Sequence, residues 1–301
     1  MVSNLEKAKI LTQALPFIKR YHGKTIVIKY GGSAMTDQKI KEQFIQDVVL
    51  MKFVGINPVV VHGGGPEINA MLEKIGKESR FVEGNRVTDL ETVEIVEMIL
   101  SGKVNKDLVS NINRHGGRAI GLSGKDDNMI LVEKKFIEND GETIDIGYVG
   151  EIKEINTDII DMLDFNNYIP VISTIGVDKE GQTYNIHADY VAGEIAGKIK
   201  ADRLIFLTDV DGIMQDHTNK ETLISDITRK EVEILIENGT ISGGMLPKVE
   251  TCLHALKKGV ENVIILNGKI EHSILLELFT EEGAGTLIKE NKTQEDITWK
   301  Q

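Results

Sequence analysis

Short runs of apolar, β-branched residues alternate along the chain with segments in which apolar residues recur every three or four positions. The short runs predict buried strands, and the longer spacing predicts amphipathic helices. The alternation as a whole predicts an α/β protein with a mostly parallel open sheet and helices on both of its faces. The strands are expected at Thr25–Lys29, Pro58–His62, Arg118–Leu122, Tyr168–Ser173, Arg203–Thr208 and Asn262–Leu266, and helices at Glu67–Lys74, Leu90–Ser101, Ala188–Lys198 and Pro247–Lys258.

One stretch in the middle of the chain departs from this alternation. Strand-like runs at Met129–Phe136 and Ile144–Ile152 flank the turn-forming residues Glu138–Gly141. Two such runs joined by a short turn predict an antiparallel hairpin.

The N-terminal segment predicts a well-defined first helix. Ser3 and Glu6 have the spacing of a capping box. Pro16 is expected to kink the helix, and Gly23 to end it. A helix before the first core strand packs either on its own domain or on a partner, and periodicity alone favours its own domain. The apolar positions of this helix are Leu5, Ala8, Leu11, Leu15 and Ile18.

The composition argues against several classes of protein. The 301 residues carry a net charge of −12, whereas a general nucleic-acid binder is usually basic. No apolar run is long enough to cross a membrane, and the N-terminus lacks the apolar stretch of a signal peptide, so a cytoplasmic protein is expected. The single cysteine, Cys252, excludes an internal disulfide and is expected in the core, and no His, Cys and carboxylate cluster has zinc spacing.

Three glycine-rich turns lie at predicted strand ends or helix starts: Lys29–Ser33, His62–Pro66 and Ser242–Lys248. In open α/β sheets, ligands bind beyond the carboxyl ends of the strands. Glycine there lets backbone N–H groups approach an anion, and a following helix adds its dipole. Any one turn could be only a tight turn, but three together, two of them with a lysine, favour phosphate chemistry.

Five charged residues are candidates for this chemistry. Lys29 ends a buried-looking strand, where a charge is costly without a partner, and Lys248 lies in a first helical turn, where the dipole disfavours a cation. Lys248 therefore indicates an anionic ligand nearby and Lys29 a task or a partner, with a solvated lysine as the alternative at either position. Asp189 starts a helix, and Asp209 and Asp211 follow a strand. For these three the sequence leaves open a ligand role, such as magnesium or nucleotide binding, or a purely structural one.

The common nucleotide motifs are missing. The chain has no G-x-x-x-x-G-K-[ST] sequence and no H-R-D catalytic loop, which excludes P-loop enzymes and protein kinases. Gly63–Gly65 does not complete G-x-G-x-x-G, because Ile68 occupies the place of the last glycine. A nicotinamide-dependent dehydrogenase is therefore disfavoured.

In their order and spacing these segments resemble the amino acid kinase family over nearly the whole chain, and within it the branch that acts on N-acetylglutamate. His187 departs from the pattern, because the family usually has asparagine there, which affects only a detail of the substrate pocket. The matching segments are Lys29–Gly32, Val60–Gly65, Gly84–Thr88, Tyr184–Asp189, Leu207–Gly212 and Gly243–Lys248.

The resemblance implies an αβα sandwich in two lobes. Residues 23–180 would bind N-acetyl-L-glutamate and form a homodimer, residues 181–301 would bind ATP with Mg²⁺, and residues 1–22 would form a kinked oligomerisation helix. The implied reaction phosphorylates the side-chain carboxylate of N-acetyl-L-glutamate, the second step of arginine biosynthesis.

The resemblance also implies site residues. Lys29 and Lys248 would stabilise the transferring phosphoryl group from opposite sides, with Asp189 holding both ammonium groups. No protein metal ligand is expected. The substrate would be bound by Gly64, Gly65, Arg86 and Asn185, and ATP by Gly31, Gly32, Thr208, Asp209, Val210, Asp211, Gly212, Ile213, Thr240, Ile241 and Ser242.

The two ends of the chain resemble arginine-sensitive, hexameric members of the family. Residues 3–20 would pair dimers into a trimer of dimers, and Gly268–Ile288 would bind L-arginine as an inhibitor through His272, Glu277 and Gly285. Two alternatives remain from the sequence: another carboxylate or carbamate kinase of this family, and a non-catalytic amino-acid sensor.

Overall fold

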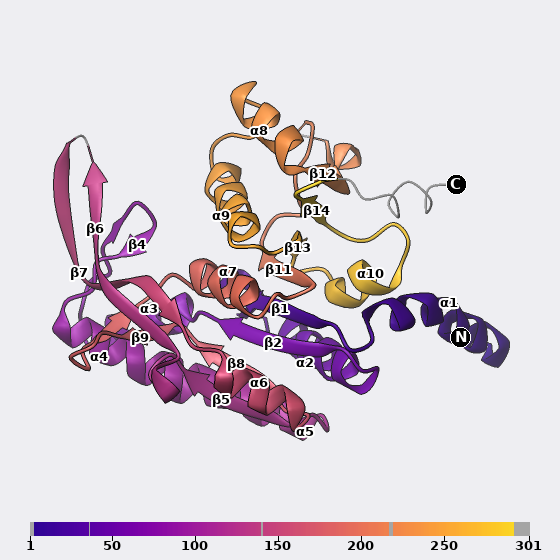
Figure 1. Ribbon diagram of the computed structural model, residues 1–301, viewed down its shortest axis with the longest axis horizontal. Coiled ribbons are helices and arrows are strands. Elements are labelled where there is room, and N and C mark those ends of the chain that lie inside the picture. The colour runs from indigo at the N-terminus through magenta and orange to yellow at the C-terminus, as the bar shows by residue number, and fades with distance from the viewer. Residues whose placement is uncertain (1–2, 36, 140, 217–218, 292–301) are drawn as a thin grey trace.

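A computed structural model describes residues 3–35, 37–139, 141–216 and 219–291, and an eight-stranded sheet lies at its centre (Figure 1). The strand order is β12-β14-β13-β11-β1-β2-β8-β5, and only β13 and β14 pair antiparallel. The predicted mostly parallel sheet is therefore confirmed. Its strands are β1 (Thr25–Tyr30), β2 (Asn57–His62), β5 (Ala119–Ser123), β8 (Ile169–Ser173), β11 (Arg203–Thr208), β12 (Asp226–Thr228), β13 (Asn262–Asn267) and β14 (Thr286–Lys289).

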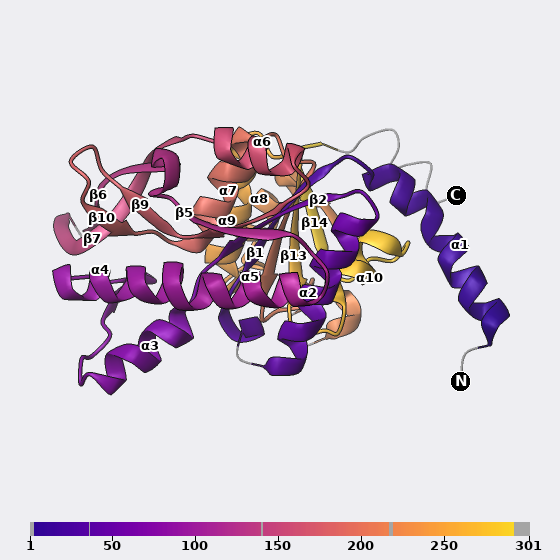
Figure 2. The same cartoon turned by 90° about the horizontal axis from the view of Figure 1, so that it is seen from below.

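Helices cover both faces of this sheet, as an αβα sandwich requires (Figure 2). Successive strand residues point to opposite faces, so Ile26 and Ile28 join one hydrophobic core while Val27 joins the other. The two cores thus lie on the two faces of one sheet and not in two halves of the chain. One layer holds α2 (Gln38–Phe53), α5 (Asn105–Arg114) and α10 (Ser273–Phe279), and the other holds α6 (Asp158–Phe165), α7 (Ala188–Lys198), α8 (Arg229–Glu237) and α9 (Met245–Lys257).

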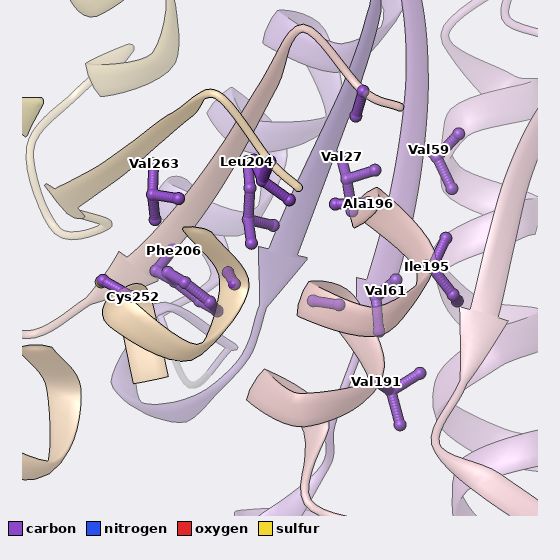
Figure 3. Packing of buried hydrophobic residues seen from close by; sticks show 14 of the residues in the cluster. Val27, Val59, Val61, Val191, Ile195, Ala196, Leu204, Phe206, Cys252 and Val263 are labelled. Carbon is purple, nitrogen blue, oxygen red and sulfur yellow. The ribbon is translucent and has the colours of Figure 1, made fainter. Parts of the chain in front are cut away.

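Helix α7 packs directly over the middle of the sheet. Val191, Ile195 and Ala196 on α7 face the valines of β1 and β2, and Cys252 of α9 lies in the same core (Figure 3). The predicted core position of Cys252 is confirmed. This packing fixes the N-terminus of α7 at the carboxyl end of β1.

The predicted hairpin projects from the sheet (Figure 1). Its strands β6 (Ile130–Asn139) and β7 (Glu142–Ile155) are longer than expected. They close on β9 (Ile175–Val177) and β10 (Thr183–Asn185) in a small four-stranded arrangement.

The predicted helix at Leu90–Ser101 is only the first part of a longer one. Helix α4 (Leu90–Glu97) continues through a π-helical segment, η2 (Met98–Val104), into α5. The wide π turn brings Leu100 and Val104 against Gly64, where a Cβ would lie 2.7 Å from Leu100 Cδ2. The preceding elements are α3 (Gly65–Lys74), β3 (Phe81–Val82) and β4 (Asn85–Arg86), and single 3₁₀ turns occur at Gly32–Met35, Asp126–Asn128 and Lys220–Thr222.

Helix α1 (Asn4–Tyr21) extends away from the body of the molecule (Figure 2). The capping box is confirmed, because Ser3 N donates to Glu6 Oε2 and Glu6 N donates to Ser3 Oγ. The helix continues through Pro16 and ends before Gly23, whose φ of 76° suits glycine. Within the described residues it is the C-terminal end that meets the rest of the chain, at α10 and at Arg203, so the packing on its own domain that periodicity favoured is wrong for most of its length.

None of the helices in the described ranges has the length and apolarity needed to cross a bilayer.

Candidate functional site

The sheet changes direction at β1. The chain leaves β1 toward β2 on one side and later returns to β11 on the other. In such open sheets the crevice beyond the carboxyl ends at the switch point is the usual ligand site. The glycine turns that follow β1 and β2 meet there because the two strands are parallel.

A cavity of about 220 Å³ occupies this crevice, and we call it the catalytic cavity. It brings together Lys29, the glycines and the four predicted substrate-binding residues. None of the residues that line it is aspartate or glutamate. The lining consists of Lys29, Gly31, Gly32, Gly63, Gly64, Gly65, Pro66, Ile68, Phe81, Gly84, Asn85, Arg86, Leu100, Val149, Thr174, Asn185, Ile186, His187 and Ala188.

Lys29 forms an ion pair at the N-terminus of α7. Its Nζ lies 2.9 Å from Oδ1 of Asp189, the second residue of that helix. Burial acts to raise the pKa of Asp189, but the charges of Lys29, His187 and Lys248 outweigh it and hold the pKa below its usual value. Asp189 is thus an ionised partner for lysine and a poor proton acceptor.

Lys248 lies in the first turn of α9, as predicted, but it has a different partner. Its Nζ is 2.8 Å from Oδ1 of Asp209, which follows β11. The expectation that Asp189 holds both ammonium groups is therefore wrong for Lys248. The start of α9 lies over the end of β11, which brings Asp209 within hydrogen-bonding distance of Lys248.

Arg86 lines the catalytic cavity with 7% of its surface exposed. Its guanidinium donates to Ser79 Oγ at 2.6 Å and to Asn69 Oδ1 at 2.7 Å, and it lies over the ring of Phe81. These partners are neutral, and no carboxylate in the described part of the chain pairs with Arg86. A buried cation held by neutral groups provides a strong site for an anion.

Asn185 and His187 form the wall of the catalytic cavity next to α7. Asn185 ends β10, where its backbone pairs with β7 and β9. His187 caps α7 without a side-chain cap bond, and its Nδ1 lies 3.9 Å from Asp189 Oδ2. The unusual residue of the motif therefore faces both the cavity and the Lys29–Asp189 pair.

The predicted nucleotide segments lie beside this site. Thr208 ends β11 and its Oγ1 accepts from Val210 N, while Asp211 accepts from Asn267 Nδ2. Gly212 has a φ of 147°, and a Cβ there would lie 2.4 Å from Thr286 Oγ1. The Lys248–Asp209 pair joins this loop to α9, the helix that Thr240, Ile241 and Ser242 precede.

No three His, Cys, Asp or Glu side chains of the described residues cluster in a way that would hold a metal ion.

A second cavity, of about 180 Å³, lies between the end of α1 and α10, and we call it the α1–α10 cavity. Glu277, predicted to contact arginine, lines it, and Gly285 N donates to Glu277 Oε2. His272 is not in the lining, and its Nδ1 lies 2.6 Å from Oδ1 of the buried Asp47. The lining consists of Phe17, Arg20, Tyr21, Arg203, Ser225, Asp226, Glu277, Leu278, Thr280, Glu281, Glu282, Gly283 and Leu287.

Sequence reasoning missed the residues that orient the predicted ones. Asn69 and Ser79 hold Arg86, yet neither lies in a recognisable motif. Thr174 and Leu100 also line the catalytic cavity. Their sequence segments predicted only secondary structure, a strand and a helix, and no function. Their roles come from distant contacts, so no local signal marked them.

Comparison with known proteins agrees with this geometry. The model of the amino acid kinase family matches residues 24–267. The acetylglutamate kinase of Methanocaldococcus jannaschii is 56% identical over 293 residues, which are 96% of this chain and 98% of that protein. The acetylglutamate kinase of Pelotomaculum thermopropionicum is 55% identical over 289 residues, 94% of this chain and 98% of that protein.

Solved structures with the same fold have lower identity. N-acetylglutamate synthase from Neisseria gonorrhoeae, complexed with coenzyme A and N-acetyl-glutamate, superposes with a TM-score of 0.81 at 24% identity over 95% of this chain. The chain spans 64% of that synthase. Carbamate kinase from Giardia lamblia bound to AMP-PNP gives a TM-score of 0.62 at 18% identity, over 89% of this chain and 99% of the other. At these identities the likeness concerns the fold alone.

Proposed function

The chain belongs to the amino acid kinase family, and we propose that it transfers the γ-phosphoryl group of ATP to the side-chain carboxylate of N-acetyl-L-glutamate. The product is N-acetyl-L-glutamyl 5-phosphate, and the reaction is a step of arginine biosynthesis in the cytoplasm. The observation that carries the proposal is the catalytic cavity, which is lined both by the buried Arg86 and by Lys29, the partner of Asp189. A dicarboxylate fits this lining, because the cavity offers it two separate cationic side chains.

The lining favours an N-acylated glutamate over free glutamate. Free glutamate carries an ammonium group, whereas the lining residues are neutral or basic and the adjacent Asp189 carboxylate is already paired with Lys29. An acetamido group is neutral, and Ile68, Leu100 and Val149 provide apolar surface for its methyl group. A buried ammonium without an anionic partner costs far more than a buried amide.

The chemistry requires little beyond positioning and charge. The acceptor carboxylate is already ionised at pH 7, so no general base is needed. The obstacle is an anion that attacks an anion, and Lys29, Lys248 and the glycine amides counter it. Asp189 orients Lys29, while Asp209 orients Lys248.

ATP enters as its magnesium complex, so the metal belongs to the substrate. We infer that the segment Thr208–Ile213, together with Thr240–Ser242, binds the nucleotide. Substitutions there are expected to raise the KM for ATP first. Lys248 supports this role, because it links the loop after β11 to the start of α9.

A coupled assay for ADP formation tests the substrate assignment. We expect ADP formation that depends on N-acetyl-L-glutamate, with free glutamate a poor substrate. Equal turnover of the two would contradict the specificity, and turnover of carbamate would favour the carbamate kinase alternative. An absence of turnover despite substrate binding would favour the sensor, although a sensor has no need for the Lys29–Asp189 pair.

We also propose that L-arginine inhibits this enzyme from the α1–α10 cavity. Arg203 Nε and Asp226 Oδ1 are buried there without a hydrogen-bond partner among the described residues. Arginine carries a carboxylate for Arg203 and a guanidinium for Asp226 or Glu277, so one ligand would satisfy both. Bound arginine would lower the affinity for acetylglutamate by favouring one arrangement of the lobes.

The inhibited form is proposed to be a trimer of dimers joined through α1. Leu5, Leu11 and Leu15 are exposed on this helix, whereas Ile18 is half-buried near its base. A helix that pairs with its own copy across a two-fold axis would cover this stripe.

Deletion of residues 1–20 is expected to give active dimers that no longer respond to arginine. A full-length protein that runs as a dimer and ignores millimolar arginine would refute both parts.

A further inference from the structure

His62 is fully buried at the end of β2, directly before the glycine turn of the catalytic cavity. Both of its ring nitrogens have partners. Nδ1 lies 2.9 Å from the carbonyl oxygen of Gly63, and Nε2 lies 3.1 Å from Nδ2 of Asn105. The first partner belongs to the turn that lines the catalytic cavity.

The contacts of Asn105 determine which ring nitrogen carries the hydrogen. Asn105 is buried, and its Nδ2 lies 2.8 Å from the Val171 oxygen and 3.3 Å from the Leu122 oxygen. Backbone carbonyls only accept, so this atom of the side chain is the NH₂ group. Its Oδ1 faces the Lys106 ammonium at 3.2 Å, which only donates. Nε2 of His62 therefore accepts from Asn105, and Nδ1 carries the hydrogen that is donated to Gly63.

The surroundings also keep His62 uncharged. Burial lowers its pKa to about 4, and the nearby Lys106 charge acts in the same direction, although the bond to Gly63 opposes them. A neutral imidazole has one donor and one acceptor, which match the two partners. Neither nitrogen is available for proton transfer to a substrate.

This bond fixes the peptide between Gly63 and Gly64. A trans peptide is planar, and its C=O and N–H point in opposite directions. Because the Gly63 carbonyl points to the buried ring, the Gly64 N–H points away from it. Gly63, Gly64 and Gly65 all line the catalytic cavity. The Gly64 N–H has no acceptor among the residues that the structure describes.

We propose that His62 is a positioning residue, which holds the Gly63–Gly64 peptide so that the Gly64 N–H donates to the acceptor substrate. Without this bond the peptide can rotate, because glycine on both sides permits many backbone conformations. A rotated peptide would present a carbonyl oxygen to an anionic substrate. The inference rests on the proposed function for the identity of that substrate.

Two matched substitutions separate the two contacts of His62. In His62→Asn the side-chain amide can occupy the place of Nδ1 and still donate to Gly63. In His62→Gln the longer side chain reaches Asn105 but not Gly63. We expect His62→Gln to lower kcat/KM for N-acetylglutamate by roughly a hundredfold, the usual effect of a lost oriented donor. His62→Asn is expected to stay within about tenfold of wild type, and ATP affinity to change little in either variant.

Equal losses in the two variants, at similar thermal unfolding midpoints, would overturn the proposal, because a merely structural role does not distinguish them.

Nitrogen-15 NMR of histidine in the wild-type protein gives a second test that needs no variant to fold. We expect His62 to be protonated at Nδ1 and not to titrate between pH 5.5 and 8. Protonation at Nε2 would also overturn the proposal. Failure of acetylglutamate turnover in wild type would instead count against the proposed function.

Discussion

The two cavities are built in different ways. The catalytic cavity is formed by strand ends and glycine turns of one continuous sheet, and its charged groups already have partners: Lys29 with Asp189, and Arg86 with Ser79 and Asn69. The α1–α10 cavity is assembled from the end of α1, the region of α10 and the strand starts at Arg203 and Asp226, and it leaves Arg203 Nε and Asp226 Oδ1 without hydrogen bonds. The first is organised before a ligand arrives, as catalysis needs. In the second, Glu277 accepts from two amides and Asp226 pairs with Lys289, but two buried polar atoms remain for a ligand to satisfy, which suits a site that responds to an effector.

The largest effect is expected at the lysines of the catalytic site. Lys29→Ala and Lys248→Ala should each lower kcat roughly a hundredfold or more, since each removes one preorganised cation from the transferring phosphoryl group. Steady-state kinetics with saturating ATP and N-acetylglutamate give the measurement. Near-normal kcat in both variants would show that catalysis does not depend on these lysines.

Arg86→Lys should act mainly on substrate binding. Lysine keeps the charge, but its single ammonium group cannot donate to Ser79 and Asn69 and at the same time form two parallel hydrogen bonds to a carboxylate. We expect the KM for N-acetylglutamate to rise roughly thirtyfold, with a smaller change in kcat. The KM for ATP serves as the internal control. A rise in the KM for ATP of the same size would mean that the substitution disturbs the whole site and not one carboxylate contact.

The parts of the catalytic site that depend on local sequence patterns could be predicted from the sequence. Lys29, Gly64 and Asp189 lie in short motifs at strand ends, and the parallel sheet brings such ends together, so their proximity followed from local patterns. Asp209 as the partner of Lys248 depends on how far α9 reaches over β11, which no local pattern specifies.

The π-helical segment was missed for a similar reason, and periodicity alone also misplaced α1. Periodicity gives the buried face of a helix but not the neighbour that covers it. For α1, periodicity alone favoured packing on its own domain, whereas the family resemblance predicted an oligomerisation helix, and Leu11 is 73% exposed. Likewise Leu100 followed a helical pattern that did not indicate the wider turn beneath Gly64.

Glu277→Gln tests the α1–α10 cavity with a smaller expected effect. Glutamine can still accept from the amides of Ala284 and Gly285, so the loop keeps its shape while the negative charge is lost. We expect the arginine concentration for half-inhibition to rise roughly tenfold, as for the loss of one bond to a charged group. Glu261→Gln, exposed on the same lobe and outside the cavity, is the matched control. The same arginine response in both variants would remove Glu277 from the effector site.

The smallest effect concerns Asp47, which joins α2 to His272 at the start of α10. Burial raises the pKa of Asp47 to about 6, although the hydrogen bond and charge of His272 and the Leu275 amide oppose the rise. The native protein therefore binds a proton at Asp47 that the unfolded chain, with an ordinary pKa of 3.8, has already released. Stability from this group is present below pH 4 and is lost as the pH rises toward 6.

Asp47→Asn removes that titration, so the variant should gain stability relative to wild type between pH 4 and pH 7. We expect about 1 kcal/mol, less than the full shift implies, because His272 is 40% exposed and water reaches the pair. Urea unfolding of both proteins at several pH values gives the difference directly. A difference that stays constant across this range would mean that Asp47 is already ionised in the native protein, and that the contact between α2 and α10 is a permanent ion pair.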